Sequence, residues 1–294
     1  MAPAVRPASQ TRVRVRNISA GSSQNRDDQV ATEEPLEIRI EGDFPVQQAA
    51  VTMRTPGNDL ELAAGFLLSE GIVHHRDDIR QISYCIDPSL TAEQRYNVVT
   101  VMLAGGMTVD LAPLERHFAI TSACGVCGKT SLDQLETRGT ARLPDGPVVP
   151  ASLLTGLPEA LRSRQRLFDT TGGLHAAALF DAGGQLVAVR EDVGRHNALD
   201  KLLGWALLDG RLPAHDGIVL VSGRASFELA QKCAVAGIPV LCAVSAPSSL
   251  AIDVAKRFNL TLVGFLREDR CNVYAGFERV AVLDSIGPIT RALV

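Results

Sequence analysis

The sequence predicts an α/β protein whose N-terminal part is α+β and whose C-terminal part is a layered α/β sandwich. In the first part, short segments with alternating apolar and polar residues flank one amphipathic helix. From residue 175 onward, strands made of continuous apolar residues alternate with helical segments. Such strands are typical of a largely parallel sheet that is buried on both faces. A stretch rich in Gly and Pro separates the two parts.

The N-terminal part is expected to span residues 11–137, after a leader at 1–10 that we expect to be disordered. Alternation predicts strands at 11–18, 36–40, 49–54, 79–86 and 96–103. The polar residues 21–35 are expected to form a loop. A helix should begin at Asn58 or Asp59 and end at Gly71, with an apolar face made of Leu60, Ala63, Ala64, Leu67 and Leu68.

The C-terminal part is expected to span residues 151–294, after a linker at 138–150. Helices are predicted at 152–166, 196–208, 227–236 and 248–258. Strands are predicted at 176–180, 186–190, 218–222, 239–244 and 260–265. The segment Asp181-Ala182-Gly183-Gly184 predicts a hairpin between the first two of these strands.

Composition excludes several classes of protein. The net charge is -4 and aromatic residues make up 4%, so neither a basic field nor a base-stacking surface for nucleic acid is predicted. The apolar runs are far shorter than the roughly 20 residues that a membrane-spanning helix needs, and no secretory signal is evident. The six cysteines are irregularly spaced, which is typical of a reduced, cytoplasmic protein.

Two cysteines, Cys124 and Cys127, lie three positions apart, and each is followed by glycine. No second C-x-x-C segment completes a four-cysteine zinc site within one chain. A helix is predicted at 129–136, and its N-terminus together with Lys129 would stabilise a thiolate. The other cysteines carry weaker signals, since Cys233 and Cys242 are expected to be buried and nothing marks Cys85 or Cys271.

Turns that follow predicted buried strands form a candidate anion site. Ser222-Gly223-Arg224 and residues 245–249 each lie between a strand and a helix, where backbone N–H groups suit phosphate. Arg224 could add a bidentate contact, and Arg267 and Arg270 could hold phosphates or stack on a planar base. Ordinary helix capping by Ser226 and Ser248 is the alternative for the two turns, and a solvated charged loop is the alternative for residues 265–270.

A third group of polar residues combines acid, base and imidazole at a predicted strand-to-helix junction. It contains Glu191, Asp192 and His196, and His175 follows a glycine pair nearby in the sequence. These side chains could shape a ligand site, carry protons or hold the junction together. Their roles stay open at this point.

Several of these segments occur together in a characteristic order. They are Arg54-Thr55-Pro56-Gly57-Asn58-Asp59, Ser122-Ala123-Cys124-Gly125-Val126-Cys127-Gly128, Thr171-Gly172-Gly173-Leu174-His175, Glu191-Asp192-Val193-Gly194-Arg195-His196-Asn197, Ser222-Gly223-Arg224 and Gly264-Phe265-Leu266-Arg267. In this order, over residues 13–274, the chain resembles the FdhD family, the sulfur-carrier accessory proteins of formate dehydrogenase.

The resemblance implies a sulfurtransferase that takes persulfide sulfur from a cysteine desulfurase. It would pass the sulfur to the molybdenum cofactor, bis(molybdopterin guanine dinucleotide), for formate dehydrogenase, with GDP as a mimic of the bound cofactor. Cys124 would carry the persulfide and Cys127 would assist or relay. The cofactor-binding stretch would be Phe265, Leu266, Arg267, Glu268, Asp269 and Arg270. We add Ser222, Gly223 and Arg224 to it, because their turn is the candidate anion site described above. The C-terminal part would have a cytidine-deaminase-like fold, and the protein would be a cytoplasmic homodimer.

Two other functions are compatible with the residues. Cys124 and Cys127 could serve a thiol–disulfide oxidoreductase, although the order of elements around a thioredoxin-like active site is not evident. Alternatively, two C-x-x-C loops could share zinc across a dimer in a guanine-nucleotide-binding module without catalysis. The sequence leaves open whether Cys127 is essential, which desulfurase donates, whether other molybdoenzymes are served, and what the leader does.

Overall fold

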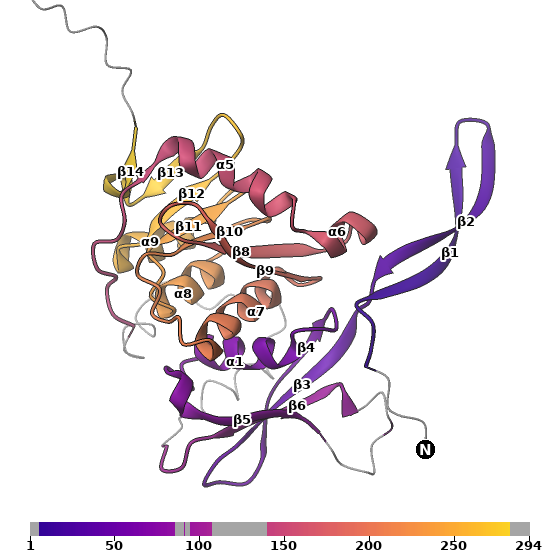
Figure 1. The fold of residues 1–294 in the computed structure, drawn as a ribbon, viewed down its shortest axis with the longest axis horizontal. Coiled ribbons are helices and arrows are strands. Elements are labelled where there is room, and N and C mark those ends of the chain that lie inside the picture. The colour runs from indigo at the N-terminus through magenta and orange to yellow at the C-terminus, as the bar shows by residue number, and fades with distance from the viewer. Residues whose placement is uncertain (1–5, 86–90, 92–94, 108–139, 283–294) are drawn as a thin grey trace, which may run out of the picture.

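The computed structural model describes residues 6–85, 91, 95–107 and 140–282. The predicted helix at 129–136 and the cysteine pair at 124 and 127 lie outside these residues. The described elements stack in layers, with a small sheet, a layer of helices, a larger sheet and one further helix (Figure 1). Outside the segment 21–35, discussed below, each predicted strand and helix in the described part has a counterpart of the same type.

The first layer is a four-stranded sheet in the order β4-β3-β6-β5. Its strands are β3 (Glu34–Glu41), β4 (Gln47–Arg54), β5 (Ile79–Tyr84) and β6 (Val98–Leu103). β3 and β6 pair in parallel, and the other two pairs are antiparallel. Every second residue of β3 is buried, and this face lies under helix α1 (Asp59–Ser69), as the alternating pattern predicted.

The second sheet has six strands in the order β13-β12-β11-β10-β8-β9. They are β8 (His175–Phe180), β9 (Leu186–Asp192), β10 (Ile218–Val221), β11 (Val240–Ala243), β12 (Thr261–Gly264) and β13 (Asn272–Ala275). Only the β10–β11 and β11–β12 pairs are parallel. The expectation of a largely parallel sheet was therefore wrong. Three pairs are antiparallel: β9 returns along β8 in the predicted hairpin, β8 runs opposite to β10, and β13 returns along β12. β13 is a half-exposed strand that the apolar pattern did not reveal.

Helices cover both faces of the larger sheet. Helices α7 (Arg195–Leu208), α8 (Phe227–Val235) and α9 (Ser249–Phe258) lie on one face, and α5 (Ala151–Arg162) lies on the other (Figure 1). α5 packs through Leu154, Leu157 and Leu161 against inward-facing side chains of β8 and β10. One predicted helix at 152–166 is in fact α5 followed by the separate short helix α6 (Arg166–Thr171).

The two sheets share one hydrophobic core, because α1 packs directly on α7. The crossing uses two glycines. A Cβ on Gly65 would lie 1.9 Å from the carbonyl oxygen of Asp200, and a Cβ on Gly204 would lie 1.8 Å from that of Glu61. The backbones of the two helices therefore approach to a distance that no larger residue permits at these positions.

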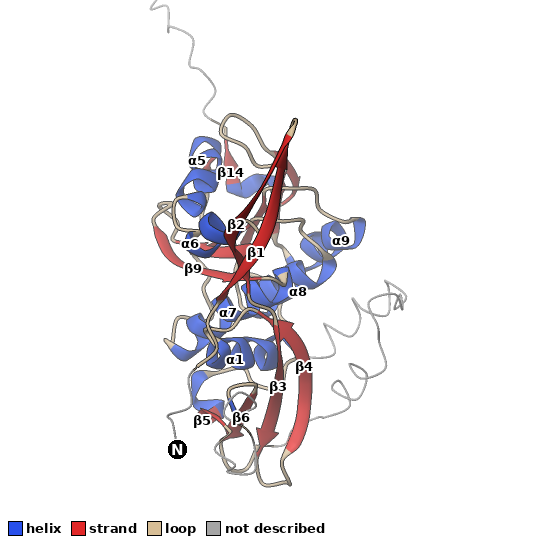
Figure 2. Ribbon diagram, turned by 90° about the vertical axis from the view of Figure 1, so that its right-hand side faces the viewer, coloured by secondary structure: helices blue, strands red, loops and turns tan. Residues whose placement is uncertain are grey.

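Residues 10–31 form a two-stranded antiparallel hairpin, which we call the arm. It consists of β1 (Gln10–Ser19) and β2 (Ser22–Ala31) and extends away from the rest of the molecule in Figure 1. In Figure 2 the same hairpin faces the viewer and lies in front of the C-terminal part. The strand predicted at 11–18 is confirmed, whereas the loop predicted at 21–35 was wrong. The sequence pattern did not predict β2, because eight of its ten residues, Ser22 to Gln29, are polar and both of its faces meet solvent, so no alternation arises.

The remaining short elements are one pair of two-residue strands and two single-turn helices. β7 (Val149–Pro150) pairs in parallel with β14 (Val280–Ala281). Two single-turn helices occur at Arg76–Asp78 and Phe277–Arg279. Residues 140–148, in the predicted linker, carry neither helix nor strand, yet Leu143 is buried and its N–H donates to the carbonyl of Phe258 at 2.9 Å.

Candidate functional site

Three loops meet at the carboxyl ends of β10, β11 and β12. The N–H of Ser245 donates to the carbonyl of Gly223 at 3.2 Å, and the N–H of Phe265 donates to the carbonyl of Ser245 at 3.1 Å. The N–H of Ser248 also donates to the carbonyl of Ala225 at 2.9 Å. The turns that the sequence singled out therefore lie side by side at one sheet edge, which is where α/β sheets bind ligands.

A cavity of about 1060 Å³ opens beside this edge. The first of its walls is the C-terminal half of α5 together with α6, and the second is formed by Gly172, Gly173 and His175. The three loops contribute Ser222, Val244 and Glu268. The cavity is at the upper end of the size range of small-molecule and cofactor pockets in proteins.

The predicted residues take different positions around this cavity. Ser222 lines it, and the Ser222 hydroxyl accepts a hydrogen bond from the N–H of Ala176 at 2.9 Å. Gly223 lies next to it, where a Cβ would come within 3.4 Å of the imidazole Nδ1 of His175. Glu268 lines the cavity, whereas Leu266 is fully buried in the core below it.

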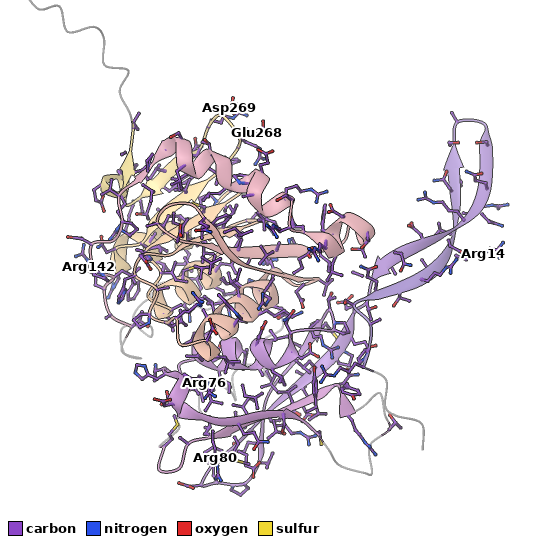
Figure 3. The ribbon with its side chains drawn as sticks, in the orientation of Figure 1. Arg14, Arg76, Arg80, Arg142, Glu268 and Asp269 are labelled. Carbon is purple, nitrogen blue, oxygen red and sulfur yellow. The ribbon has the colours of Figure 1, made fainter. Side chains whose placement is uncertain are left out.

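The other predicted residues lie in the same loops but do not line the cavity. Phe265 is 42% exposed and has a φ of 50°, so its ring projects from the loop. One guanidinium nitrogen of Arg267 donates to the carbonyls of Val244 (2.5 Å), which lines the cavity, and Leu266 (2.9 Å), so Arg267 ties its own loop to the cavity wall. Arg224, Asp269 and Arg270 are exposed and are not among the described residues that line the cavity. Figure 3 shows Asp269 and Glu268 in the same exposed loop.

Reasoning from sequence missed the wall contributed by α6 and the glycine pair. Gln165 and Phe168 line the cavity together with Gly172 and Gly173. The segment Thr171–His175 is one of the segments that carry the family resemblance, so the sequence did mark it. Its place at the cavity could not be predicted, because it depends on a contact with strands far along the chain. Burial lowers the pKa of His175, and the nearby charges of Arg195 and His196 lower it further.

Glu191 holds the α6 wall in place. The two carboxylate oxygens accept hydrogen bonds from the N–H groups of Leu167 (3.1 Å) and Phe168 (2.9 Å) in the first turn of α6. A carboxylate at a helix N-terminus satisfies unpaired donors and complements the helix dipole. This contact gives Glu191 a positioning role at the cavity.

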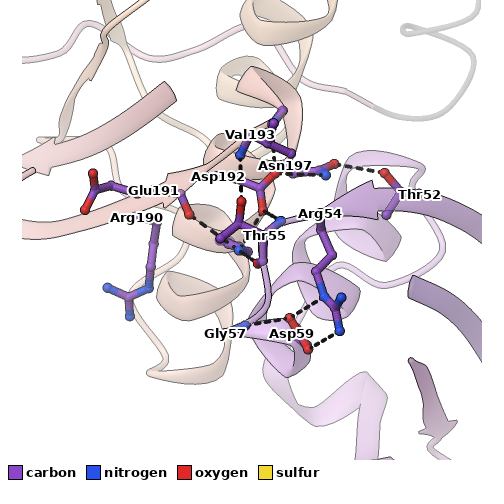
Figure 4. A network of polar contacts seen from close by, with 12 residues as sticks. Thr52, Arg54, Thr55, Gly57, Asp59, Arg190, Glu191, Asp192, Val193 and Asn197 are labelled. Atoms are coloured by element: carbon purple, nitrogen blue, oxygen red, sulfur yellow. Dashed lines mark hydrogen bonds and ion pairs between the residues drawn. The ribbon is translucent and has the colours of Figure 1, made fainter. Parts of the chain in front are cut away.

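Asp192 joins the two halves of the molecule (Figure 4). Its buried carboxylate pairs with Lys201 Nζ at 2.7 Å and accepts hydrogen bonds from the N–H groups of Thr55 (3.1 Å) and Gly194 (2.8 Å). Lys201 in turn donates to the carbonyl of Thr55 at 2.8 Å, and Asn197 donates to the carbonyl of Met53 at 2.8 Å. The junction between β9 and α7 therefore binds the backbone at the end of β4.

Arg54 anchors the other side of that segment and is fully buried. Its guanidinium makes a bidentate contact with Asp59, at 3.1 Å and 3.0 Å (Figure 4). It also donates to Asn97 at 3.1 Å. A fully buried, multiply bonded arginine fixes backbone geometry. The motif at 54–59 is thus a structural joint in this fold.

A second cavity, of about 540 Å³, lies between β4, α1, α7 and α8. His196 lines it, and His196 Nε2 contacts a carboxylate oxygen of Glu228 at 2.5 Å. This contact lowers the pKa of Glu228. Deeper in the wall, Lys232 pairs with Asp200 at 2.7 Å, and Ser69 donates to the same carboxylate at 2.8 Å.

Three of the four cysteines in the described part of the chain, Cys233, Cys242 and Cys271, are poorly suited to nucleophilic work. Cys233 and Cys242 are fully buried, as expected, and burial raises the pKa of Cys233 to about 12 and that of Cys242 strongly. Burial also raises the pKa of the half-buried Cys271. A thiol with a raised pKa holds little thiolate at neutral pH.

Comparison with known proteins identifies the family. The family model described as "FdhD/NarQ family" matches residues 31–281. The chain belongs to this family. It is 53% identical to the sulfur carrier protein FdhD of Streptomyces coelicolor, covering 94% of this chain and 97% of that protein. It is 51% identical to the FdhD of Mycolicibacterium paratuberculosis, covering 92% and 98%.

A solved structure shares the fold along nearly the whole chain. It is a Desulfotalea psychrophila protein provisionally described as a formate dehydrogenase accessory protein, with a TM-score of 0.71 and 26% identity. The match covers 92% of this chain and 99% of that one. In the described residues of this FdhD-family chain, every helix is too short or too polar to cross a membrane.

Proposed function

We propose that this protein is a sulfur carrier that accepts persulfide sulfur on Cys124 and delivers it to the molybdenum cofactor of formate dehydrogenase. The observation that carries the proposal is the match to sulfur carrier proteins FdhD at about half identity over more than nine-tenths of the chain. Cys124 and Cys127 lie within that match and outside the described residues. The raised pKa values of Cys233, Cys242 and Cys271 support the assignment of the nucleophile to the C-x-x-C pair.

Loading of the carrier is a thiol exchange. The Cys124 thiolate attacks the outer sulfur of a persulfide on a cysteine desulfurase, which forms a persulfide on Cys124 and releases the desulfurase thiolate. The rate depends on the thiolate fraction and on access, so a glycine-flanked thiol suits the reaction. Delivery as sulfide requires two electrons, which Cys127 supplies when its thiolate displaces the outer sulfur and forms a disulfide with Cys124.

We propose the cavity at the sheet edge as the site of the acceptor. Bis(molybdopterin guanine dinucleotide) has two pyrophosphate groups, and the turn at Ser222-Gly223 presents backbone and hydroxyl groups toward the cavity. The exposed side chains of Phe265, Arg224 and Arg270, in loops that contribute residues to the cavity, would supply an aromatic face and positive charge for the guanine ends. His175 adds a ring nitrogen at the cavity wall.

The remaining features of the proposal follow the family resemblance. We propose a cytoplasmic homodimer that receives sulfur from a cysteine desulfurase and serves formate dehydrogenase. The six-stranded sheet with helices on both faces supports a cytidine-deaminase-like architecture for residues 151–294. The division into 11–137, a linker at 138–150 and 151–294 stays a prediction.

Formate dehydrogenase maturation in cells that lack their own carrier tests the proposal. Wild type should restore formate dehydrogenase activity, and Cys124→Ala should abolish it while Cys233→Ala retains it. Full activity with Cys124→Ala would contradict the assignment. In a separate titration, GDP should bind the purified protein, and Ser222→Tyr, which fills the cavity mouth, should weaken this binding by at least about tenfold.

Zinc analysis and insulin reduction of the same purified protein separate the alternatives. A zinc content of half a metal per chain that disappears in Cys124→Ala would favour the zinc-stapled module. Catalytic turnover of insulin would favour the oxidoreductase. The sulfur-carrier proposal expects neither result.

A further inference from the structure

A third cavity, of about 430 Å³, lies apart from the sheet edge where we propose the acceptor site. It is bounded by the segment 140–144, by α8 and by the turns that follow α1 and precede β10. None of the described residues that line it also lines the cavity at the sheet edge. Its volume falls within the range of small-molecule pockets in proteins, so it has room for a small organic ligand.

The segment 140–144 forms a fixed wall of this cavity, although it contains neither helix nor strand. The N–H of Leu143 donates to a carbonyl at the end of α9, and the side-chain amide of Asn259 donates to the carbonyl of Leu143, each at 2.9 Å. The buried Arg279 donates to the next carbonyl along the chain at 2.8 Å. The backbone that carries Arg142 is therefore anchored at the cavity.

The opposite wall is formed by Gly237, Pro213 and His215. A Cβ on Gly237 would lie 2.5 Å from the Cβ of Pro213, so these two segments are in direct contact. His215 Nδ1 lies 3.1 Å from the carbonyl oxygen of Gly237. Because a carbonyl only accepts hydrogen bonds, Nδ1 carries the hydrogen, and Nε2 is left for a ligand. His74 supplies a second imidazole from the turn after α1, where its backbone N–H donates to Asp78 at 2.7 Å.

The charged and titratable side chains at this cavity are all basic. They are Arg142, His74 and His215, and no Asp or Glu is among the described residues that line the cavity. All three are exposed, and within the described part of the chain none of them forms an ion pair. In a chain whose net charge is -4, three basic groups that converge without a carboxylate favour an anionic ligand.

The rest of the wall suits an organic body rather than a bare ion. Pro144, Pro213 and Val235 supply apolar surface, and Gln231 adds a side-chain amide. Gln231 is half-buried, and its amide makes no hydrogen bond to any described residue. Small-molecule pockets combine mainly apolar walls with a few convergent polar groups in this way.

We propose that this cavity binds a small organic phosphate, with the phosphate against Arg142, His74 and His215 and the organic part against Pro213 and Val235. The guanidinium donates to two phosphate oxygens at once. A phosphate also meets either form of His215 Nε2, because its oxygens accept hydrogen bonds and its hydroxyl donates one. The site is separate from the cavity at the sheet edge and does not depend on the sulfur-carrier function.

NMR titration of the full chain with phenyl phosphate tests the proposal, because the ring of this probe shifts the methyl signals of residues that it contacts. The methyl signals of Ala234 and Val235, which line the cavity, should shift to saturation with a dissociation constant of about 1 mM or lower. Inorganic phosphate should compete. Benzyl alcohol, which has the ring without the phosphate, should bind at least about tenfold more weakly.

Matched variants assign the binding to this cavity. Arg142→Glu should weaken it at least about tenfold, whereas Arg80→Glu, an equal change of charge at another exposed arginine, should leave it unchanged (Figure 3). Ser222→Tyr, at the other cavity, should also leave it unchanged, and Arg142→Glu should still bind GDP. Thermal melting checks that the variants remain folded.

Three results would overturn the proposal. The first is the absence of a saturable shift of the two methyl signals up to about 10 mM probe. The second is equal binding by wild type and Arg142→Glu. The third is a loss of binding in Ser222→Tyr, which would place the phosphate at the sheet edge instead.

Discussion

The buried carboxylate of Asp192 shows how single residues hold this fold together. Its partners come from two distant parts of the chain. Lys201 lies in α7, shortly after Asp192, whereas Thr55 directly follows the last residue of β4. Removing one member of a buried ion pair leaves the other charge uncompensated. The same motif therefore joins the two sheets and, through the adjacent Glu191, fixes the wall of the candidate site.

The substitution Asp192→Ala is expected to lower the free energy of unfolding by about 3–5 kcal/mol, because it leaves Lys201 buried and unpaired. Urea denaturation measures this change. The matched control is Asp209→Ala, which removes a half-exposed partner of Arg211 and should cost less than about 1 kcal/mol. Equal losses for the two variants would show that the buried pair is not a structural joint.

His175 is expected to titrate below its ordinary pKa of 6.5, because burial and the charges of Arg195 and His196 disfavour the imidazolium. The folded state then binds a proton less readily than the unfolded state. The stability that this group contributes is present above pH 6.5 and is lost as the pH falls through the folded-state value.

NMR titration of the imidazole signals measures this pKa directly. Arg195→Gln removes one of the charges that lower it, so the pKa of His175 should rise in that variant. A His175 pKa above the ordinary value in the wild type would contradict the description of the cavity wall.

The glycines at the α1–α7 crossing are the clearest case of an element fixed by close backbone approach. Gly204→Ala places a methyl group against the carbonyl of Glu61, so the helices must separate. We expect a loss of several kcal/mol in the free energy of unfolding, of the order of other overpacked core substitutions or more. Gly65→Ala should act in the same way, against Asp200.

The control for this prediction is Gly156→Ala in α5. A Cβ there meets no atom within 4 Å, so the substitution should stabilise the protein by up to about 1 kcal/mol through helix propensity. Thermal and urea denaturation of both variants provide the comparison. A Gly204→Ala protein as stable as wild type would show that the crossing is looser than described.

At the level of elements, the spacing of apolar residues predicted the helices and strands that pack one or both faces against the core. α1 and the buried strand β10 have an apolar face or an unbroken apolar run, and both were predicted to within a residue or two. β2 is exposed and β13 is only partly buried, and the existence of both strands depends on pairing with a neighbour, so composition alone gave no signal. The break between α5 and α6 depends on Glu191, which lies far away in the sequence.

In the whole molecule, the loops of the candidate site could be predicted from the sequence, but the packing of the helices around them could not. The three loops at the sheet edge could be predicted, because the carboxyl ends of neighbouring parallel strands must meet. The contribution of Gly172, Gly173 and α6 could not, since it depends on how α5 turns at its end. The direct packing of α1 on α7 could not be predicted either. Gly65 and Gly204 indicate a close approach of two helices only once it is known which helices face each other.

The central claim, that Cys124 carries the sulfur, is tested most directly by mass spectrometry of the reduced protein after incubation with a cysteine desulfurase and cysteine. Wild type should gain one sulfur atom, peptide mapping should place it on Cys124, and Cys124→Ala should gain none at that peptide. Cys233→Ala serves as the control, because that thiol is fully buried and should not affect loading. The absence of added sulfur on the Cys124 peptide of the wild type, in the presence of an active desulfurase, would contradict the account.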